Sequence, residues 1–189
     1  MDPDRALVEA AAAGSREAFD DLVRRHQVAI VALTRALTSG AADAEDLAQE
    51  AFVRAWKSLR SFRGDSSFRT WLHRIAINVV RTAQTRHGRW TRMFTAAEPD
   101  ADPPSPEEPL DAALARRQVI ERALASLPEE LRVAVALRDM QGLDYREIAA
   151  VLDVPIGTVE SRIFRARRRL KPLLAPLLQT GPAVTGQER

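Results

Sequence analysis

Five prolines and five acidic residues are crowded into one short stretch of the chain, residues 97–109 (AEPDADPPSPEEP). This stretch has no large apolar side chain, so it cannot contribute to a hydrophobic core and is expected to be an extended linker. The remaining sequence falls into two parts, each of the size of a small domain. We predict an N-terminal domain at 1–92, a flexible acidic linker at 93–110, a C-terminal domain at 111–178 and a disordered tail at 179–189.

Both parts have the composition and periodicity of helices. Ala, Leu, Arg and Glu dominate, strand-like alternation is missing, and apolar residues recur at helical spacing. The N-terminal part is expected to begin with a helix over about 6–37, broken near Gly14. A second helix would start at an Asp43 cap, and a third would follow a serine-capped loop at 61–67. The sequence therefore predicts an all-α fold of two small helical domains joined by an acidic, proline-rich linker.

The helix that starts at Asp43 has one apolar face, and Phe52 and Trp56 on that face are expected to lie in the core. Its opposite face is polar and could be an ordinary solvated surface. The third helix has an apolar stripe of Phe68, Trp71, Leu72, Ile75, Ala76 and Val79. Asn78 lies on the other side, between Arg74 and Arg81. Asparagine is a poor helix former, and an Asn–Arg row matches side chains that bind bases and phosphates, although a tolerated surface Asn is the alternative.

The C-terminal part is expected to form helices at about 110–126, 129–140, 145–152 and 156–171. The last two, joined by a tight turn at Asp153, have the layout of a helix-turn-helix. Phe164 has mostly polar and basic helical neighbours, so we expect it to be exposed among arginines, where it could contact DNA. The alternative is that these arginines only solvate the end of a helix.

Charge is unevenly distributed although the net charge is only +2. Residues 61–92 contain seven arginines and one acid, and residues 154–171 contain six basic residues and one acid. Residues 93–130, between them, contain nine acids and three arginines. Two separate basic blocks indicate two contacts with a polyanion such as nucleic acid, unless each is simply a solvated helix face.

Several classes of protein are disfavoured by what the sequence lacks. There is no cysteine, and His26, His73 and His87 have no metal-ligand spacing, so each is expected to be solvated or hydrogen-bonded. No nucleophile–base pair or phosphate-binding glycine loop is visible, so we expect no enzyme, no cofactor and no metal. No signal peptide or spanning apolar run is present either, and a cytoplasmic protein without membrane insertion is expected.

Three segments together resemble one protein family. DAEDLAQEAFVRAW (43–56) and FRGDSSFRTWLHRIAINVVRT (62–82) resemble the second conserved region of the extracytoplasmic-function sigma factors of bacterial RNA polymerase. LPEELRVAVALRDMQGLDYREIAAVLDVPIGTVESRIFRARRRL (127–170) resembles their fourth region. The resemblance covers roughly residues 15–172, with the motifs in the family's order. It implies a transcription initiation factor that binds core polymerase, reads the minus-35 and minus-10 promoter elements and promotes strand opening.

The resemblance also implies roles for particular residues. Binding to core polymerase, at the clamp of its β′ subunit, would involve Asp46, Gln49, Glu50 and Arg54. Reading of the minus-10 element, with one base flipped out of the duplex, would involve Phe62, Arg63, Gly64, Asp65, Ser66 and Ser67, with Asn78 beneath them and Arg74 and Arg81 on the backbone. Reading of the minus-35 element in the major groove would involve Glu160, Ser161, Arg162, Phe164, Arg165 and Arg168. The implied partners are core RNA polymerase through its β′ clamp and β subunits, promoter DNA and an anti-sigma factor.

The sequence departs from the family pattern at two positions. Asp153 stands in the turn where a glycine is common, and Asp tolerates the left-handed conformation better than most residues. Glu160 stands where many relatives have a basic or neutral residue, which leaves the promoter sequence open. An autonomous helix-turn-helix regulator is the main alternative, although no dimerisation helix is visible. A helical adaptor protein is a third possibility, but it would not explain two basic faces.

Overall fold

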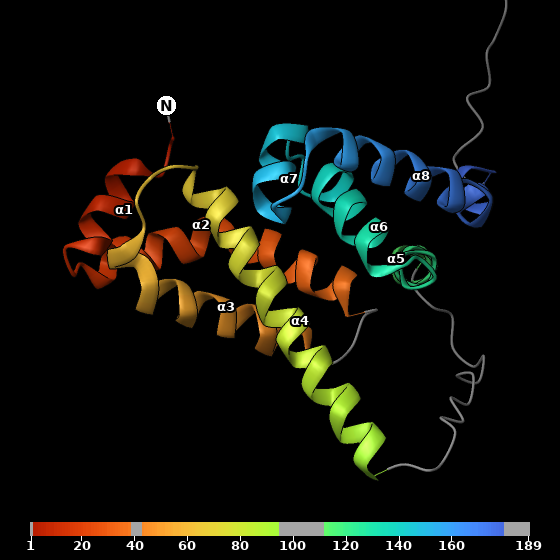
Figure 1. The fold of residues 1–189 in the computed structure, drawn as a ribbon, viewed down its shortest axis with the longest axis horizontal. Helices are drawn as coiled ribbons and strands as arrows, with labels where there is room; N and C mark the ends of the chain where they lie inside the picture. Colours follow the sequence, from red (N-terminus) through yellow and green to blue (C-terminus); the bar gives the residue numbers. More distant parts are fainter. Residues whose placement is uncertain (1, 39–42, 95–111, 180–189) are drawn as a thin grey trace, which may run out of the picture.

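The computed structural model describes residues 2–38, 43–94 and 112–179, and every regular element in these ranges is a helix (Figure 1). The elements, with the labels of Figure 1, are α1 Arg5–Ala12, α2 Arg16–Leu37, α3 Ala44–Ser58, η1 Leu59–Ser61, α4 Phe68–Phe94, α5 Ala112–Ala125, α6 Glu129–Val135, η2 Ala136–Met140, α7 Tyr145–Leu152 and α8 Ile156–Gln179. The all-α prediction is confirmed. Residues 95–110 of the predicted linker and 180–189 of the predicted tail lie outside the described residues. Met93 and Phe94, predicted as linker, belong to α4, and Gln179, predicted as tail, ends α8.

The first domain is a bundle of α1 to α4. The expected break in its first helix is present: Gly14 has a φ of +109°, which suits glycine, and the Ser15 hydroxyl caps α2 by accepting the Ala18 N–H at 3.2 Å. α2 packs against α3 and α4, and its Leu22, Ile30 and Leu33 are fully buried. Asp43 precedes α3 as predicted, but its side chain makes no capping hydrogen bond.

Helix α4 is buried on two sides. The predicted stripe is inside, with Phe68 and Leu72 fully buried and Trp71 partly buried. A second stripe that the sequence analysis did not identify is buried as well: Thr70, His73, Ile77 and Val80. Because these four residues recur at intervals of three and four, they lie on one face of the helix. The far end of α4 projects beyond the rest of the bundle (Figure 1).

The second domain contains α5 to α8, and its helix-turn-helix forms as predicted. Asp144 and Glu147 make a reciprocal capping box at the start of α7, with both hydrogen bonds at 2.8 Å. Asp153 ends α7 in the left-handed conformation, with φ +54° and ψ +53°. This conformation lets the chain reverse tightly into α8, and it explains how Asp can stand in place of glycine.

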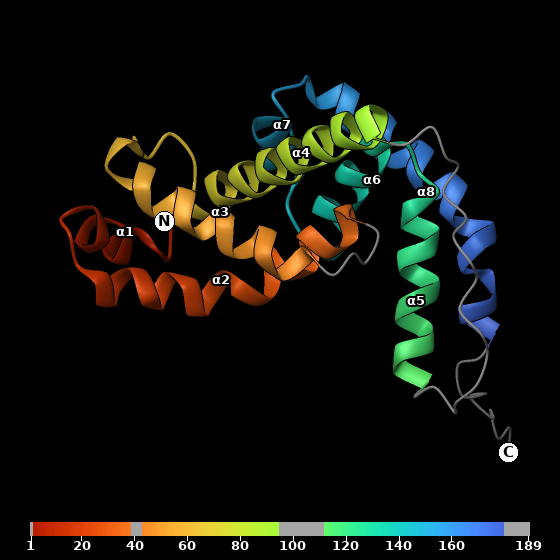
Figure 2. The same ribbon diagram turned by 90° about the horizontal axis from the view of Figure 1, so that it is seen from below.

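Two helix boundaries differ from the prediction. The segment predicted as a helix over 129–140 changes to a π-helix at Ala136–Met140, where the Gln141 N–H binds the Ala136 carbonyl five residues back. Helix α8 was predicted to end at 171, but it continues through Pro172 and Pro176 to Gln179. A proline removes a backbone hydrogen bond, and packing of this last part against α5 offsets the loss (Figure 2).

The two domains are in direct contact. Helix α2 packs against α5, η2 and α6, and α4 packs against α7. As a result, buried apolar residues of both domains join one continuous cluster. This contact was not predicted from the sequence, because nothing in the local pattern distinguishes a helix face that meets another domain from one that meets its own core.

Candidate nucleic-acid and polymerase interfaces

The polar face of α3 points away from the bundle. Asp46, Gln49 and Glu50 are exposed, and Arg54 is partly buried. The Arg54 guanidinium binds the Glu50 carboxylate at 2.7 Å, one turn away on the same helix. The opposite face of α3 packs inward, where Trp56 meets the Phe19 ring at 4.9 Å between centroids. Packing thus leaves the predicted core-polymerase residues together on one accessible helix face.

The loop of residues 62–67 joins η1 to α4 and covers aromatic side chains. The Phe62 ring lies 5.0 Å from the Trp71 ring and 6.4 Å from the Phe68 ring, between centroids. Gly64 has a φ of +76° and open space around it. Ser67 caps α4 by accepting the Thr70 N–H at 3.1 Å. The aromatic contacts and the cap hold both ends of the loop, while Arg63 and Asp65 are exposed.

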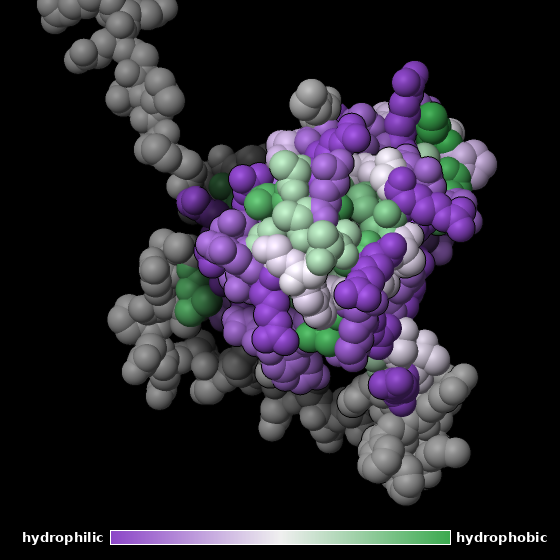
Figure 3. All heavy atoms as spheres, turned by 90° about the vertical axis from the view of Figure 1, so that its left-hand side faces the viewer, coloured by the Kyte–Doolittle hydropathy of each residue, from purple (hydrophilic) through white to green (hydrophobic). Residues whose placement is uncertain are grey.

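A pocket of about 810 Å³ lies beside this loop. All six of the loop residues predicted for the minus-10 site line it, together with residues of the chain's N-terminal segment. Figure 3 looks onto this end of the molecule and shows hydrophilic side chains around a less polar area. The pocket is not lined by Asn78, which lies about three helical turns further along α4 and is exposed. The structure therefore does not bring Asn78 beneath the loop as expected.

Arg74, Asn78 and Arg81 lie along the exposed side of α4. Arg81 forms an ion pair with the second domain: its Nε donates to the Glu129 carboxylate of α6 at 2.8 Å. A pocket of about 590 Å³ surrounds this pair and is lined by Arg81, Gln84, Thr85, Glu129, Glu130 and Arg162. Arg162 belongs to the predicted minus-35 set, so the packing of the two domains, here called the closed arrangement, brings residues of both predicted DNA sites to one pocket that Glu129 and Glu130 also line.

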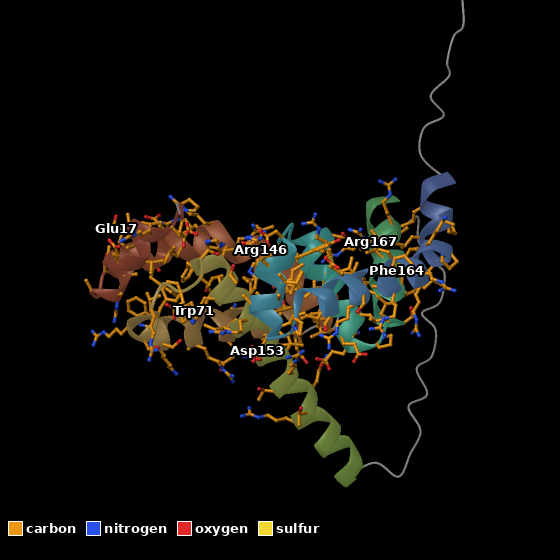
Figure 4. All side chains as sticks on the ribbon, turned by 45° about the horizontal axis from the view of Figure 1, so that its top comes forward. Glu17, Trp71, Arg146, Asp153, Phe164 and Arg167 are labelled. Carbon is orange, nitrogen blue, oxygen red and sulfur yellow. The ribbon has the colours of Figure 1, made fainter. Side chains whose placement is uncertain are left out.

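Helix α8 presents the other predicted DNA residues on its outer side. Phe164 is 68% exposed, as expected for an aromatic side chain among arginines, and Figure 4 shows it on α8. Glu160, Ser161, Arg165 and Arg168 are also exposed, whereas Arg162 is partly buried. The buried side of the same helix consists of Val159, Ile163, Ala166 and Leu170. This division matches the amphipathic pattern of the sequence.

Arg167 has a structural contact that the sequence did not reveal. Its guanidinium makes two hydrogen bonds to the Asp139 carboxylate, at 3.1 and 2.5 Å, and thereby joins α8 to η2. The hydrogen bond to Asp139 raises the pKa of Arg167 above its usual value. Among the arginines at 167–169, Arg167 therefore has a structural role within the domain. Arg167 and Asp139 are 28 residues apart in the sequence, so no local pattern predicts this pair.

Further polar contacts between the domains lie at the second stripe of α4 and at the neighbouring Arg69. The Arg69 guanidinium donates to the backbone carbonyl of Gln141, and Thr70 lies 3.5 Å from the Glu147 carboxylate. His73 is fully buried, donates from Nδ1 to the Arg69 carbonyl at 2.7 Å and lies 3.3 Å from the Gln141 side chain. Burial lowers the pKa of His73. The expectation of a hydrogen-bonded histidine is confirmed for His73 and also for His26, whose Nε2 lies 2.7 Å from the Asp4 carboxylate.

Within the described residues, no three His, Asp or Glu side chains lie together so that they could hold a metal ion, and no helix is both long and apolar enough to cross a membrane. The side chain of His87 lies outside the described part of the chain.

Comparison with known proteins identifies two family matches. Residues 22–90 match the family described as "Sigma-70 region 2", and residues 117–170 match "Sigma-70, region 4". The chain is 41% identical over 187 residues to the ECF RNA polymerase sigma-E factor of Escherichia coli K12, with 93% of this chain and 96% of the relative covered. It is 40% identical over 192 residues to the RNA polymerase sigma-H factor of Pseudomonas aeruginosa, with 95% and 97% covered.

Two solved structures are similar over most of their length. CnrH in complex with the cytosolic domain of CnrY has a TM-score of 0.70 and 34% identity, with 92% of this chain and 97% of that chain covered. The sigma factor RpoE of Bartonella quintana, in complex with the anti-sigma factor NepR, has a TM-score of 0.69 and 31% identity, with 83% and 96% covered.

Proposed function

The chain belongs to the extracytoplasmic-function sigma factors, the initiation subunits of bacterial RNA polymerase, and from this premise we propose how its surfaces divide the work of initiation. Residues 1–92 bind core polymerase and the minus-10 element, and residues 111–178 bind the minus-35 element. The protein acts as a polymerase subunit and not as an autonomous regulator. Its place of action is the cytoplasm, where the polymerase works.

The outer face of α3 is the proposed contact with the β′ clamp of core polymerase. Asp46, Gln49, Glu50 and Arg54 are the residues that the family resemblance assigns to this contact. Their exposure supports the assignment, because each can reach a partner without unfolding the helix. The side chains of the Glu50–Arg54 ion pair are well exposed, so the pair contributes little free energy. It can therefore break at little cost when either group contacts the clamp.

The pocket at the loop of residues 62–67 is the proposed site for one base of the minus-10 element. Extruding a base from a duplex costs a few kcal/mol, which stacking and hydrogen bonding in a pocket must offset. The partly buried Phe62 ring supplies a flat apolar surface, and Arg63 and the serines supply donors. Arg74 and Arg81 lie on the exposed side of α4, where they can bind backbone phosphates.

Helix α8 is the proposed reader of the minus-35 element. A recognition helix enters the major groove with residues of its N-terminal half facing the bases. Glu160, Ser161, Phe164 and Arg165 are exposed in that half, and Arg168 lies one turn beyond Phe164. Phe164 suits the methyl group of thymine, whereas Arg165 and Arg168 suit guanine edges or phosphates.

Strand opening draws on binding free energy, and we assign no enzymatic reaction or cofactor to this chain. In the closed arrangement of the structure, Arg81 is paired with Glu129, so binding of DNA along α4 requires this pair to break. The domains would then separate to reach the two promoter elements. An inhibitory anti-sigma protein is a further proposed partner, because the similar structures include one sigma factor in complex with such a protein.

The observation that carries the proposal is the exposed polar face of α3. The other two predicted sites are assigned to DNA, so this face is the one assigned to the polymerase. The first experiment is therefore binding of the full chain to cognate core polymerase. Asp46→Ala/Glu50→Ala should weaken binding about tenfold or more, because interface charges contribute strongly when desolvated. Glu17→Ala/Glu130→Ala, which removes two exposed acids elsewhere, is the matched control. A folded wild-type chain that binds promoter DNA but not core polymerase would refute the proposal.

A further inference from the structure

The pocket at the loop of residues 62–67 has a second wall that does not come from the loop. The chain's first twelve residues contribute Asp2, Pro3, Arg5, Val8, Glu9 and Ala12 to its lining. These residues precede the stretch 22–90 that matches the region 2 family. Helix α1 thus lines the pocket from outside the matched region, whereas the loop of residues 62–67 lies within it.

This second wall is anchored firmly to the rest of the domain. The Asp2 carboxylate accepts the Asp4 N–H at 3.0 Å and the N–H of Phe68, the first residue of α4, at 2.9 Å. Asp4 is buried and binds Arg25 at 3.0 Å and His26 at 2.7 Å, both on α2. A negative carboxylate is also favoured at the N-terminus of a helix such as α4. The N-terminal segment is therefore held in place beside the loop.

The two walls together have the chemistry of a nucleotide site. Val8, Ala12 and Leu59 provide apolar contacts, and Phe62 provides an aromatic ring. The groups that can hydrogen-bond to a base or its phosphate are Arg5, Glu9, Arg60, Arg63, Asp65, Ser66 and Ser67. The volume of about 810 Å³ lies within the range of pockets that bind small ligands, so an unstacked base with its sugar can enter.

Arg5 and Glu9 are the polar side chains of α1 at this wall. The Arg5 Nε donates to Glu9 Oε1 at 2.9 Å, and the two side chains are 75% and 66% exposed. An exposed ion pair of this kind contributes little to stability. Breaking this pair so that Arg5 and Glu9 can bind a nucleotide would therefore cost little free energy. A carboxylate accepts hydrogen bonds from the exocyclic amine of adenine, cytosine or guanine, which thymine lacks, and a guanidinium binds phosphate.

We propose that α1 completes the site for the captured minus-10 base, with Glu9 selecting a base that carries an exocyclic amine and Arg5 holding its phosphate. This inference rests on the proposed function, since it assumes that the pocket receives a promoter base. It adds one specificity-determining residue, Glu9, and one phosphate-binding residue, Arg5, from a helix outside the matched family region.

Holoenzyme reconstituted from the full chain and its cognate core polymerase provides the test. Formation of heparin-resistant open complexes would be measured on promoters that carry each of the four bases at each minus-10 position. Glu9→Gln should reduce the preference for adenine, cytosine or guanine over thymine about fivefold at one position only, as expected for loss of one base contact. Arg5→Ala should lower open-complex formation about fivefold whichever base is present. Minus-35 preference and binding to core polymerase should not change.

Matched controls are available on α2, where Glu17 and Arg24 are exposed and do not line the pocket. If Glu9→Gln and Arg5→Ala behave like Glu17→Gln and Arg24→Ala, the inference is wrong. A defect of Phe62→Ala in the same assay would then still support the loop wall of the pocket. If wild-type holoenzyme forms no promoter-specific open complex, the proposed function fails, and the inference fails with it. Thermal unfolding of each variant would verify that it is folded.

Discussion

Arg81 of the first domain and Glu129 of the second are joined by an ion pair, with Arg81 Nε 2.8 Å from Glu129 Oε1. The pair links a predicted phosphate contact on α4 to the first residue of α6. Both side chains are 46% exposed, so water screens the attraction and the pair contributes at most about 1 kcal/mol. A contact of this strength can hold the closed arrangement and still give way to DNA.

Glu129→Gln is expected to favour separation of the domains, because it removes the charge that attracts Arg81. The free energy of unfolding should fall by less than about 1 kcal/mol. The measurement is energy transfer between dyes on two introduced cysteines, one in each domain, since the chain has none of its own. Glu50→Gln, which alters an exposed ion pair within α3, is the control. Equal energy transfer in both variants would show that the pair does not hold the domains together.

Acid should destabilise the native protein through His73. Burial lowers the pKa of His73 in the native state, so the unfolded chain binds the proton more tightly. The stabilising contribution is therefore present above the ordinary histidine pKa of about 6.5 and is lost as the pH falls below it. We expect urea unfolding between pH 7.5 and 5 to show a smaller pH dependence for His73→Phe than for wild type.

The same substitution separates the pH effect from the hydrogen bonds. At neutral pH, His73→Phe should itself cost about 1–3 kcal/mol, because the Arg69 carbonyl and the Gln141 side chain lose a buried partner. An unchanged pH dependence in the variant would exclude His73 as the group responsible.

Phe164→Ala should impair reading of the minus-35 element without destabilising the protein. The side chain is 68% exposed, so we expect a change in unfolding free energy of less than about 0.5 kcal/mol. Transcription from a promoter with an intact minus-35 element should fall about fivefold or more. Leu173→Ala, a change at another exposed apolar residue of α8, should leave transcription near wild type. Equal effects of the two changes would argue against a contact between Phe164 and DNA.

Asp144→Ala should destabilise the helix-turn-helix by about 0.5–2 kcal/mol, since it removes the capping hydrogen bond to the Glu147 N–H. Denaturant unfolding measures the loss. Asp144→Ser keeps an oxygen at the cap and should recover most of the stability. If serine is no better than alanine, the capping bond is not the source of the effect.

The local features of this chain were largely predictable. The break at Gly14, the caps at Ser67 and Asp144 and the tight turn at Asp153 each depend on residues within a few positions of one another. The outward position of Phe164 also followed from the helical period of its neighbours. The sequence motifs also identified the family. The residue roles within the three surfaces remain predictions.

The errors concern effects that act over long range. Helix α8 continues past Pro172 because it packs against α5, which a local rule on proline cannot anticipate. Asn78 is in a helix as predicted and does not line the pocket, and its role in DNA binding stays a prediction. The contribution of α1 to that pocket also had no local signal, since it depends on how the Asp2 segment meets the start of α4.

Periodicity, caps and charge thus determined on their own that this chain forms two helical domains with a polar face on α3 and a basic helix-turn-helix. Only the tertiary structure decided that a second face of α4 is buried, with His73 inside it and Arg81 paired to Glu129. The physical reason is that helix formation is governed by hydrogen bonds and side chains a few residues apart, whereas the covering of a face depends on which distant surface packs against it.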